Sequence, residues 1–146
     1  MSRRVDVSVE AVIARPVDVV AAYSGDPGNA PLWYANIRQV EWRTPAPVAP
    51  GSRMDFVATF LGRRIAYTYE VTELAPGKRL VMETSQGPFP MRTTYSWAAA
   101  SGGTRMVLRN DGEPAGFSRL AAPVIETAMR RAMTKDLAAL KRILEG

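Results

Sequence analysis

Two patterns, one after the other along the chain, constrain the fold more than any other feature. Between Arg38 and Asn110, apolar and polar side chains alternate in short segments, which is typical of half-buried strands. An amphipathic helix is then expected from about Pro114 to Leu144. A curved antiparallel sheet with one long helix across its apolar face cannot fill its own centre with side chains alone. The order of the elements therefore predicts an internal cavity.

Length and composition predict one domain over residues 1–146. A chain of 146 residues buries about 70% of the surface that its unfolded form exposes, so a core can form without covalent cross-links. No apolar stretch approaches the roughly 20 residues that a membrane span needs, and the first residues lack the apolar segment of a secretory signal. We therefore expect a cytoplasmic protein that does not insert into membranes.

The chain contains neither cysteine nor histidine. This excludes a thiolate nucleophile, an imidazole base, a Ser-His-Asp triad and zinc sites built from Cys or His. The carboxylates are scattered along the chain, so the sequence predicts no metal site and no cofactor. Any catalysis would have to use Asp, Glu, Tyr, Lys, Arg, water or a bound cofactor.

The net charge is +5, and most basic residues are arginines. Such a charge can indicate a nucleic-acid or anionic-membrane partner. Here the arginines are spread over every segment, with doublets only at Arg3-Arg4, Arg63-Arg64 and Arg130-Arg131. This distribution favours an ordinary solvated surface, and we expect no nucleic-acid partner.

The first third of the chain predicts one strand and two short helices. Residues 5–13 alternate β-branched and polar side chains, as in a half-buried strand. Pro16 suits the first turn of a helix that runs to about Tyr23, and Asp26-Pro27 opens a second short helix to about Tyr34. A strand from about Ile37 to Arg43 follows.

The register of the next strands follows from their turns. A two-residue turn at Leu61-Gly62 places the large apolar side chains on one face, and a one-residue slip would invert that pattern. The predicted pairs are Phe60 with Arg63, Ala58 with Ile65, Phe56 with Tyr67, and Met54 with Tyr69. The opposite face receives Arg53, Asp55, Thr59, Arg64, Thr68 and Glu70. A turn over Ala75–Lys78 then pairs Val71 with Met82 and Tyr69 with Thr84.

The C-terminal helix changes character along its apolar stripe. Met133, Leu137, Leu140 and Leu144 form a seam that fills a core well. Extrapolation at 100° per residue adds Ala122, Glu126, Met129 and Arg130 to this side and leaves out Val124, Ile125 and Ala128. We infer that the C-terminal half of the helix fills the core and the N-terminal half covers the cavity. Pro123 either starts the helix or kinks it.

Several phrases of the sequence resemble the START-related superfamily, in particular bacterial polyketide cyclase/dehydrase-like proteins (SRPBCC). These phrases are residues 12–17, Asp26-Pro27 with Trp33-Tyr34, residues 61–72, and residues 112–117 with 135–141. The resemblance implies an α+β helix-grip fold, in which a curved antiparallel sheet of seven strands wraps around a long C-terminal helix, with two short helices after the first strand. It also implies a pocket between the sheet and the helix. Family members include lipid and hormone carriers, aromatase/cyclases and regulators.

The predicted ligand-binding residues are those on the inner sheet face, near Trp33-Tyr34 and on the long helix. They are Trp33, Tyr34, Phe56, Tyr67, Tyr69, Met82, Thr84, Thr93, Tyr95, Asn110, Glu126, Met129, Arg130 and Met133. Catalytic residues stay unassigned, with Arg130, Glu126 and Tyr69 as candidates. Glu126 and Arg130, spaced i and i+4, are either a surface ion pair or a charged pair over the cavity.

Three functions follow as hypotheses. The first is binding of a small, largely apolar or amphipathic molecule such as a lipid, polyketide or aromatic compound. The second is a metal-independent cyclase or dehydratase acting on a polyketide-like substrate in the same cavity. The third is a nucleic-acid or anionic-membrane binder. Whether the protein is a monomer or a homodimer stays open.

Overall fold

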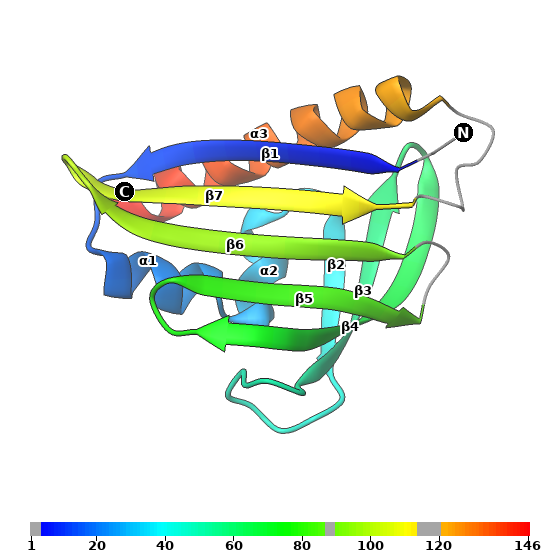
Figure 1. The fold of residues 1–146 in the computed structure, drawn as a ribbon, viewed down its shortest axis with the longest axis horizontal. Helices are drawn as coiled ribbons and strands as arrows, with labels where there is room; N and C mark the ends of the chain where they lie inside the picture. Colours follow the sequence, from blue (N-terminus) through cyan, green and yellow to red (C-terminus); the bar gives the residue numbers. More distant parts are fainter. Residues whose placement is uncertain (1–3, 87–89, 114–120) are drawn as a thin grey trace.

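The computed structural model describes residues 4–86, 90–113 and 121–146, and in it a curved antiparallel sheet grips one long helix (Figure 1). The elements are β1 (Val5–Ile13), α1 (Val17–Ser24), the 3₁₀ turn η1 (Pro27–Asn29), α2 (Ala30–Trp33), β2 (Ile37–Trp42), β3 (Arg53–Phe60), β4 (Arg63–Ala75), β5 (Arg79–Gln86), β6 (Met91–Ala100), β7 (Gly103–Gly112) and α3 (Ala122–Glu145). The predicted helix-grip architecture is confirmed.

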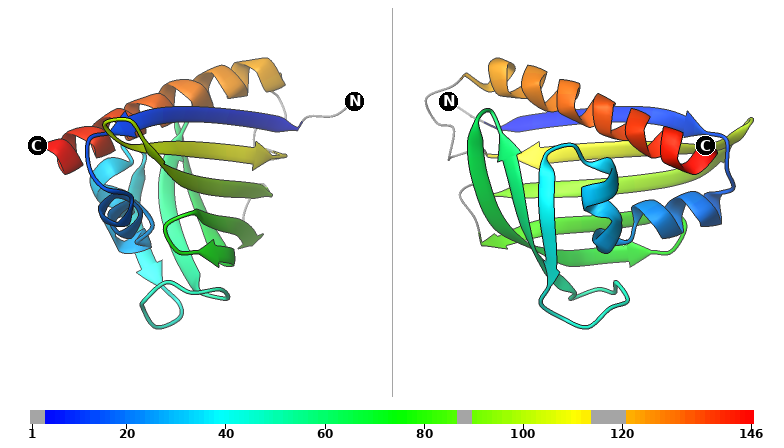
Figure 2. Two further views of the ribbon diagram at one scale, coloured as in Figure 1. Left: turned by 60° about the vertical axis from the view of Figure 1, so that its left-hand side comes forward. Right: turned by 180° about the vertical axis from the view of Figure 1, so that it is seen from behind.

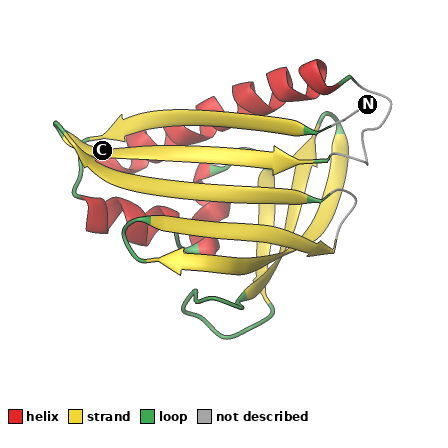
Figure 3. Ribbon diagram, in the orientation of Figure 1, coloured by secondary structure: helices red, strands yellow, loops and turns green. Residues whose placement is uncertain are grey.

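The seven strands form one sheet in the order β1-β7-β6-β5-β4-β3-β2 (Figure 3). All neighbouring strands are antiparallel, and β1 and β2 are the two edges. Seen from behind, α3 crosses the concave side of the sheet, and α1 and α2 lie on the same side (Figure 2). All three helices therefore cover one face, and the other face is left to solvent.

The β3–β4 hairpin has the register that its turn predicts. Leu61 and Gly62 have φ angles of 50° and 76°, both in the left-handed region that a type I′ turn requires. All four predicted cross-strand pairs are present. Thr59 is the exception on the polar face, because at the end of β3 it contributes to the cavity wall together with Phe60.

The turn between β4 and β5 is also as predicted. Lys78 N donates to Ala75 O at 2.9 Å, and Gly77 has a φ of 73°, which is compatible with a type II turn. The pairs Val71–Met82 and Tyr69–Thr84 are both present. These pairs bring the side chains of β4 and β5 together on the concave face.

Helix α3 begins later than the sequence predicted. It starts at Ala122, and residues 114–120 lie outside the described part of the chain. Pro123 sits in the first turn, where its missing N–H leaves no hydrogen bond unmade, so it starts the helix and does not kink it. The C-terminal half fills the core as predicted, with Leu140 fully buried and Leu137 2% exposed. None of the described helices is long and apolar enough to cross a bilayer.

The same helix covers the free edge of β1. Glu126 Oε2 accepts a hydrogen bond from Asp6 N, and Arg130 Nη1 donates to Ser8 O, each at 3.0 Å. Further along α3, Lys141 Nζ donates to Val12 O at 2.7 Å, and Glu145 Oε2 accepts from Ala14 N at 2.8 Å. An edge strand exposes unpaired backbone groups, and here charged side chains of α3 bind them.

Candidate ligand-binding cavity

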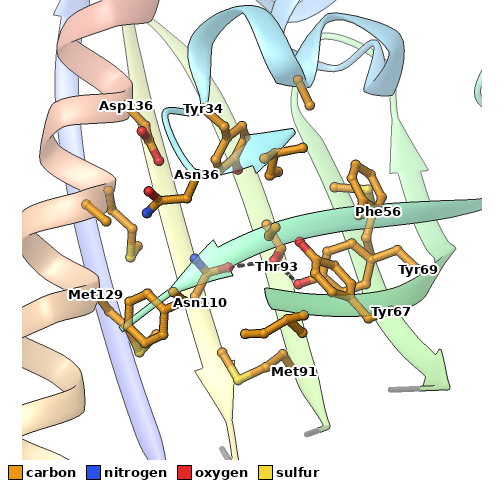
Figure 4. Close-up of a pocket in the computed structure, with 18 of the residues that line it drawn as sticks. Tyr34, Asn36, Phe56, Tyr67, Tyr69, Met91, Thr93, Asn110, Met129 and Asp136 are labelled. Carbon is orange, nitrogen blue, oxygen red and sulfur yellow. Dashed lines mark hydrogen bonds between the residues drawn. The ribbon is translucent and has the colours of Figure 1, made fainter. Parts of the chain in front are cut away.

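A cavity of about 150 Å³ lies between the concave face of the sheet and the N-terminal half of α3 (Figure 4). Its walls come from β3 to β7, from the segment around α2, and from α3, and they are mostly apolar. Six half-buried lining residues lie at the end of the sheet where α3 begins, namely Asn36, Thr59, Phe60, Tyr67, Thr84 and Asn110. Tyr34, Ile37 and Ala132, also in the wall, are half-buried as well. We infer that the cavity opens to solvent at this end.

A chain of hydrogen bonds crosses the floor of the cavity (Figure 4). Thr93 Oγ1 donates to Asn110 Oδ1 at 2.5 Å, and the Tyr69 hydroxyl is 2.6 Å from the same Thr93 oxygen. Because Thr93 has one proton and gives it to Asn110, Tyr69 must donate to Thr93. The bond from Thr93 uses only the amide oxygen of Asn110. The two N–H groups on its amide nitrogen have no hydrogen-bond partner among the described residues. Burial raises the pKa of Tyr69 to about 12, so its hydroxyl stays protonated at neutral pH.

A second pair of hydroxyls lies at the other end of the cavity. The Tyr34 and Tyr95 oxygens are 2.6 Å apart, and burial raises the pKa of both groups well above their ordinary value. Burial also raises the pKa of Tyr67, whose hydroxyl has no hydrogen bond among the described residues. At neutral pH the tyrosines therefore offer neutral hydroxyl groups, and the Tyr67 hydroxyl is available to a ligand.

Most of the predicted ligand-binding residues do line the cavity. Those brought together in its wall are Tyr34, Phe56, Tyr67, Tyr69, Met82, Thr84, Thr93, Tyr95, Asn110, Met129 and Met133. Trp33, Glu126 and Arg130 are not part of that wall. Tyr69 is therefore the one catalytic candidate from the sequence that faces the cavity.

The prediction that Glu126 and Arg130 lie over the cavity is wrong. Arg130 is exposed, Glu126 is half-buried, and both bind the backbone of β1. The reason is that α3 crosses the sheet obliquely, so the side of the helix that faces the cavity rotates along its length (Figure 2). Near its N-terminus, the side that continues the leucine seam faces β1. Ile125, which the extrapolation left out, is 2% exposed and lines the cavity.

Trp33 does not line the cavity, but it packs against two residues that do. Its ring packs on Tyr34 with centroids 4.2 Å apart and lies 5.8 Å from the ring of Tyr95. The side chain is 2% exposed, and its Nε1 has no hydrogen-bond partner among the described residues. Trp33 thus positions two cavity tyrosines, where the sequence predicted direct ligand contact.

The sequence prediction also missed Asp136, on α3, the ionisable carboxyl group among the described residues of the wall. It is 3% exposed and lines the cavity, and its Oδ1 accepts a hydrogen bond from Ala35 N at 3.0 Å. Burial raises the pKa of this carboxyl to about 6, although the bond from Ala35 and the charge of Lys135 both act to lower it. A signal was present, because Asp136 lies three residues after Met133 and next to Leu137, within the buried stripe.

The family model for polyketide cyclase / dehydrase and lipid transport matches residues 4–145. The chain belongs to this family. A search of curated proteins gave no match.

Solved structures of the START/SRPBCC superfamily share the fold of this polyketide cyclase/dehydrase family member. Ginseng major latex-like protein 151 from Panax ginseng has a TM-score of 0.80 at 12% identity, with 99% of this chain and 100% of that chain covered. A START superfamily protein from Mycobacterium smegmatis gives 0.79 at 16%, covering 99% and 98%. The Zhui aromatase/cyclase from Streptomyces sp. R1128 gives 0.77 at 18%, covering 97% and 94%. At these identities the likeness shows the fold alone.

Proposed function

We propose that this family member binds a small, largely apolar ligand in the cavity between the sheet and α3. The observation that carries the proposal is the combination of apolar walls with unused polar groups, namely the Tyr67 hydroxyl and the Asn110 amide nitrogen. Small-molecule sites in proteins have this composition, with a few polar groups that orient the ligand. The family description, polyketide cyclase / dehydrase and lipid transport, and the similar aromatase/cyclase structure support a ligand-binding role.

The size of the cavity favours a compact ligand. A cavity of about 150 Å³ is large enough for one benzene ring. A single-ring aromatic compound matches the 150 Å³ available here. A lipid or a longer polyketide would have to extend through the open end. Among the ligand classes expected from the sequence, a small aromatic compound is therefore the one we favour.

Binding can be tested with neutral single-ring compounds. We expect phenol, benzyl alcohol or acetophenone to raise the melting temperature, because a ligand at 100 times its Kd stabilises the folded state by about 2.7 kcal/mol. Ala132→Phe, which fills the cavity, should abolish the shift. Ala138→Phe is the matched control, because Ala138 is exposed on the same helix and lies outside the cavity wall. Shifts that survive Ala132→Phe, or no shift with any compound, would contradict the proposal.

Asp136 supports a second candidate function, dehydration of a β-hydroxy ketone. A carboxyl group with a pKa of about 6 exchanges protons readily near neutral pH. In this reaction the carboxylate takes the proton next to the carbonyl, the carbon–carbon double bond forms, and the hydroxyl group leaves as water with the proton that Asp136 gives back. The test is conversion of 4-hydroxybutan-2-one to the enone, followed by ultraviolet absorbance. Asp136→Asn should abolish it, and equal rates with and without the carboxylate would exclude this function.

A further inference from the structure

Within the described part of the chain, the cavity wall contains one ionisable carboxylate and no basic side chain. No Lys or Arg of residues 4–86, 90–113 and 121–146 is among the residues that line the cavity. Among these described residues, Asp136 is the sole Asp or Glu in that wall. Burial of a charge is costly unless a partner of opposite charge accompanies it, and the described residues of the cavity wall supply no such partner for this carboxylate.

No ion pair neutralises Asp136 within the described part of the chain. From the end of α2 and from β6, Tyr34 and Tyr95 face it with neutral hydroxyls. Asp136 also borders a second groove, on the outer side, whose basic residues are Arg38, Lys135 and Arg142. The charge of Lys135, the next residue on α3, acts to lower the pKa of Asp136, but the effect of burial is larger. Asp136 makes no salt bridge within the described part of the chain, and the hydrogen bond from Ala35 N occupies one of its two oxygens.

Aromatic rings surround the same space. Tyr67 lies 5.6 Å from Phe56 and 5.1 Å from Tyr69, measured between ring centroids. The Tyr34 ring lies at the end where Asp136 lies (Figure 4), and its hydroxyl is 2.6 Å from that of Tyr95. The face of an aromatic ring attracts a cation, with a gain of about 0.5 to 2 kcal/mol per contact. A single carboxylate among tyrosine rings therefore matches a ligand that carries one positive charge on a small apolar body.

We propose that the ligand of this cavity is a small amine, protonated in the bound state, with its ammonium group paired to Asp136. This inference rests on the proposed binding function and adds the charge of the ligand. The ammonium would donate to the free oxygen of Asp136, and the apolar part would occupy the space between Phe56 and Met129. Binding of the cation offsets the burial of the carboxylate, which a neutral ligand cannot do.

The test compares benzylamine with benzyl alcohol, two compounds that differ in charge and hardly in shape. We expect the intact wild-type protein to bind benzylamine at least about tenfold more tightly than benzyl alcohol at pH 8, by calorimetry. The affinity for benzylamine should fall about tenfold from pH 8 to pH 5, since Asp136 loses its charge around pH 6 and the amine and the tyrosines do not titrate there. The affinity for benzyl alcohol should not fall.

Two variants distinguish the effect of the Asp136 charge on binding from any effect on folding. Asp136→Asn keeps an acceptor for Ala35 N and should remove the preference for benzylamine and its pH dependence. Glu126→Gln makes the same charge change on the same helix outside the cavity wall and should leave both unchanged. Binding of benzyl alcohol alone, equal binding of both compounds, or a preference that survives Asp136→Asn would overturn the inference and leave the binding function intact. Failure of both compounds and of the neutral series above would overturn both proposals.

Discussion

The two faces of the sheet hold their charges in opposite ways. On the convex face, acidic and basic side chains pair across strands, as Asp6 does with Arg109 at 2.6 Å and Glu10 with Arg105. These side chains are 42% to 54% exposed, so water solvates them as well. On the concave side, Asp136 has neither a basic partner nor much water.

This difference shows which charges are informative about function. Exposed ion pairs contribute about 0 to 1 kcal/mol each and can be exchanged with little consequence. A lone buried carboxylate destabilises the ligand-free protein, and it raises the question of what compensates it. The proposed ligand selectivity therefore depends on Asp136 and not on the exposed ion pairs of the convex face.

The largest expected effect comes from removing the buried charge. The pKa of Asp136 is raised from 3.8 to about 6 on folding, so the folded state binds a proton more tightly than the unfolded state does. Its contribution to stability is therefore fully present below pH 4 and is lost as the pH rises through about 6. We expect Asp136→Asn to increase the free energy of unfolding by about 3 kcal/mol at pH 7, measured in urea. The gain should disappear near pH 4, and a loss of stability at pH 7 would contradict the comparison.

A smaller effect is expected from a neutral hydrogen bond on the concave face. Tyr69→Phe removes the hydroxyl that donates to Thr93 and leaves the aromatic ring in place. A buried hydrogen bond of this kind contributes about 1 kcal/mol, so unfolding in urea should require about that much less free energy. The loss should be the same at pH 5 and pH 8, because Tyr69 is neutral throughout this range. A pH-dependent loss would mean that Tyr69 is coupled to Asp136.

The smallest effect is expected on the convex face. The hydrogen bond and charge of Arg109 hold the pKa of Asp6 below its ordinary value. The stabilisation from this pair is therefore present above the ordinary pKa, and it is lost as the pH falls from there through the lowered pKa of the folded protein. Because the pair is about half exposed, Asp6→Asn should cost less than about 1 kcal/mol at pH 7. High salt should reduce even this difference. If Asp6→Asn lowered the free energy of unfolding more than Tyr69→Phe does, the expected order of the effects on the two faces would be reversed.

The strands were predictable because their turns are encoded locally. Leu61-Gly62 fixes the register of β3 and β4, and this register places Phe56, Tyr67 and Tyr69 on one face. Asn110 and Thr93 followed from the same alternation. Most of the cavity wall contributed by the sheet could therefore be derived from the sequence.

The part contributed by the helix could not be derived in this way. A periodic pattern gives the phase of a helix about its own axis, but it does not give the angle at which α3 crosses the sheet. That angle turns Glu126 and Arg130 toward β1 and brings Ile125 and Asp136 to the cavity. Asp136 was not among the predicted site residues, although it lies next to Leu137 within the buried stripe. The burial of a single carboxylate depends on tertiary packing, which no local pattern encodes.

The central claim is that Asp136 is an uncompensated carboxylate inside the cavity. It is tested most directly by carbon-13 NMR titration of the Asp136 carboxyl in the ligand-free protein, with Asp136→Asn to assign the signal. We predict a midpoint near pH 6 that moves down when benzylamine is added. A midpoint near the ordinary value of 3.8 would show that the carboxylate is already solvated or paired, and it would contradict the account.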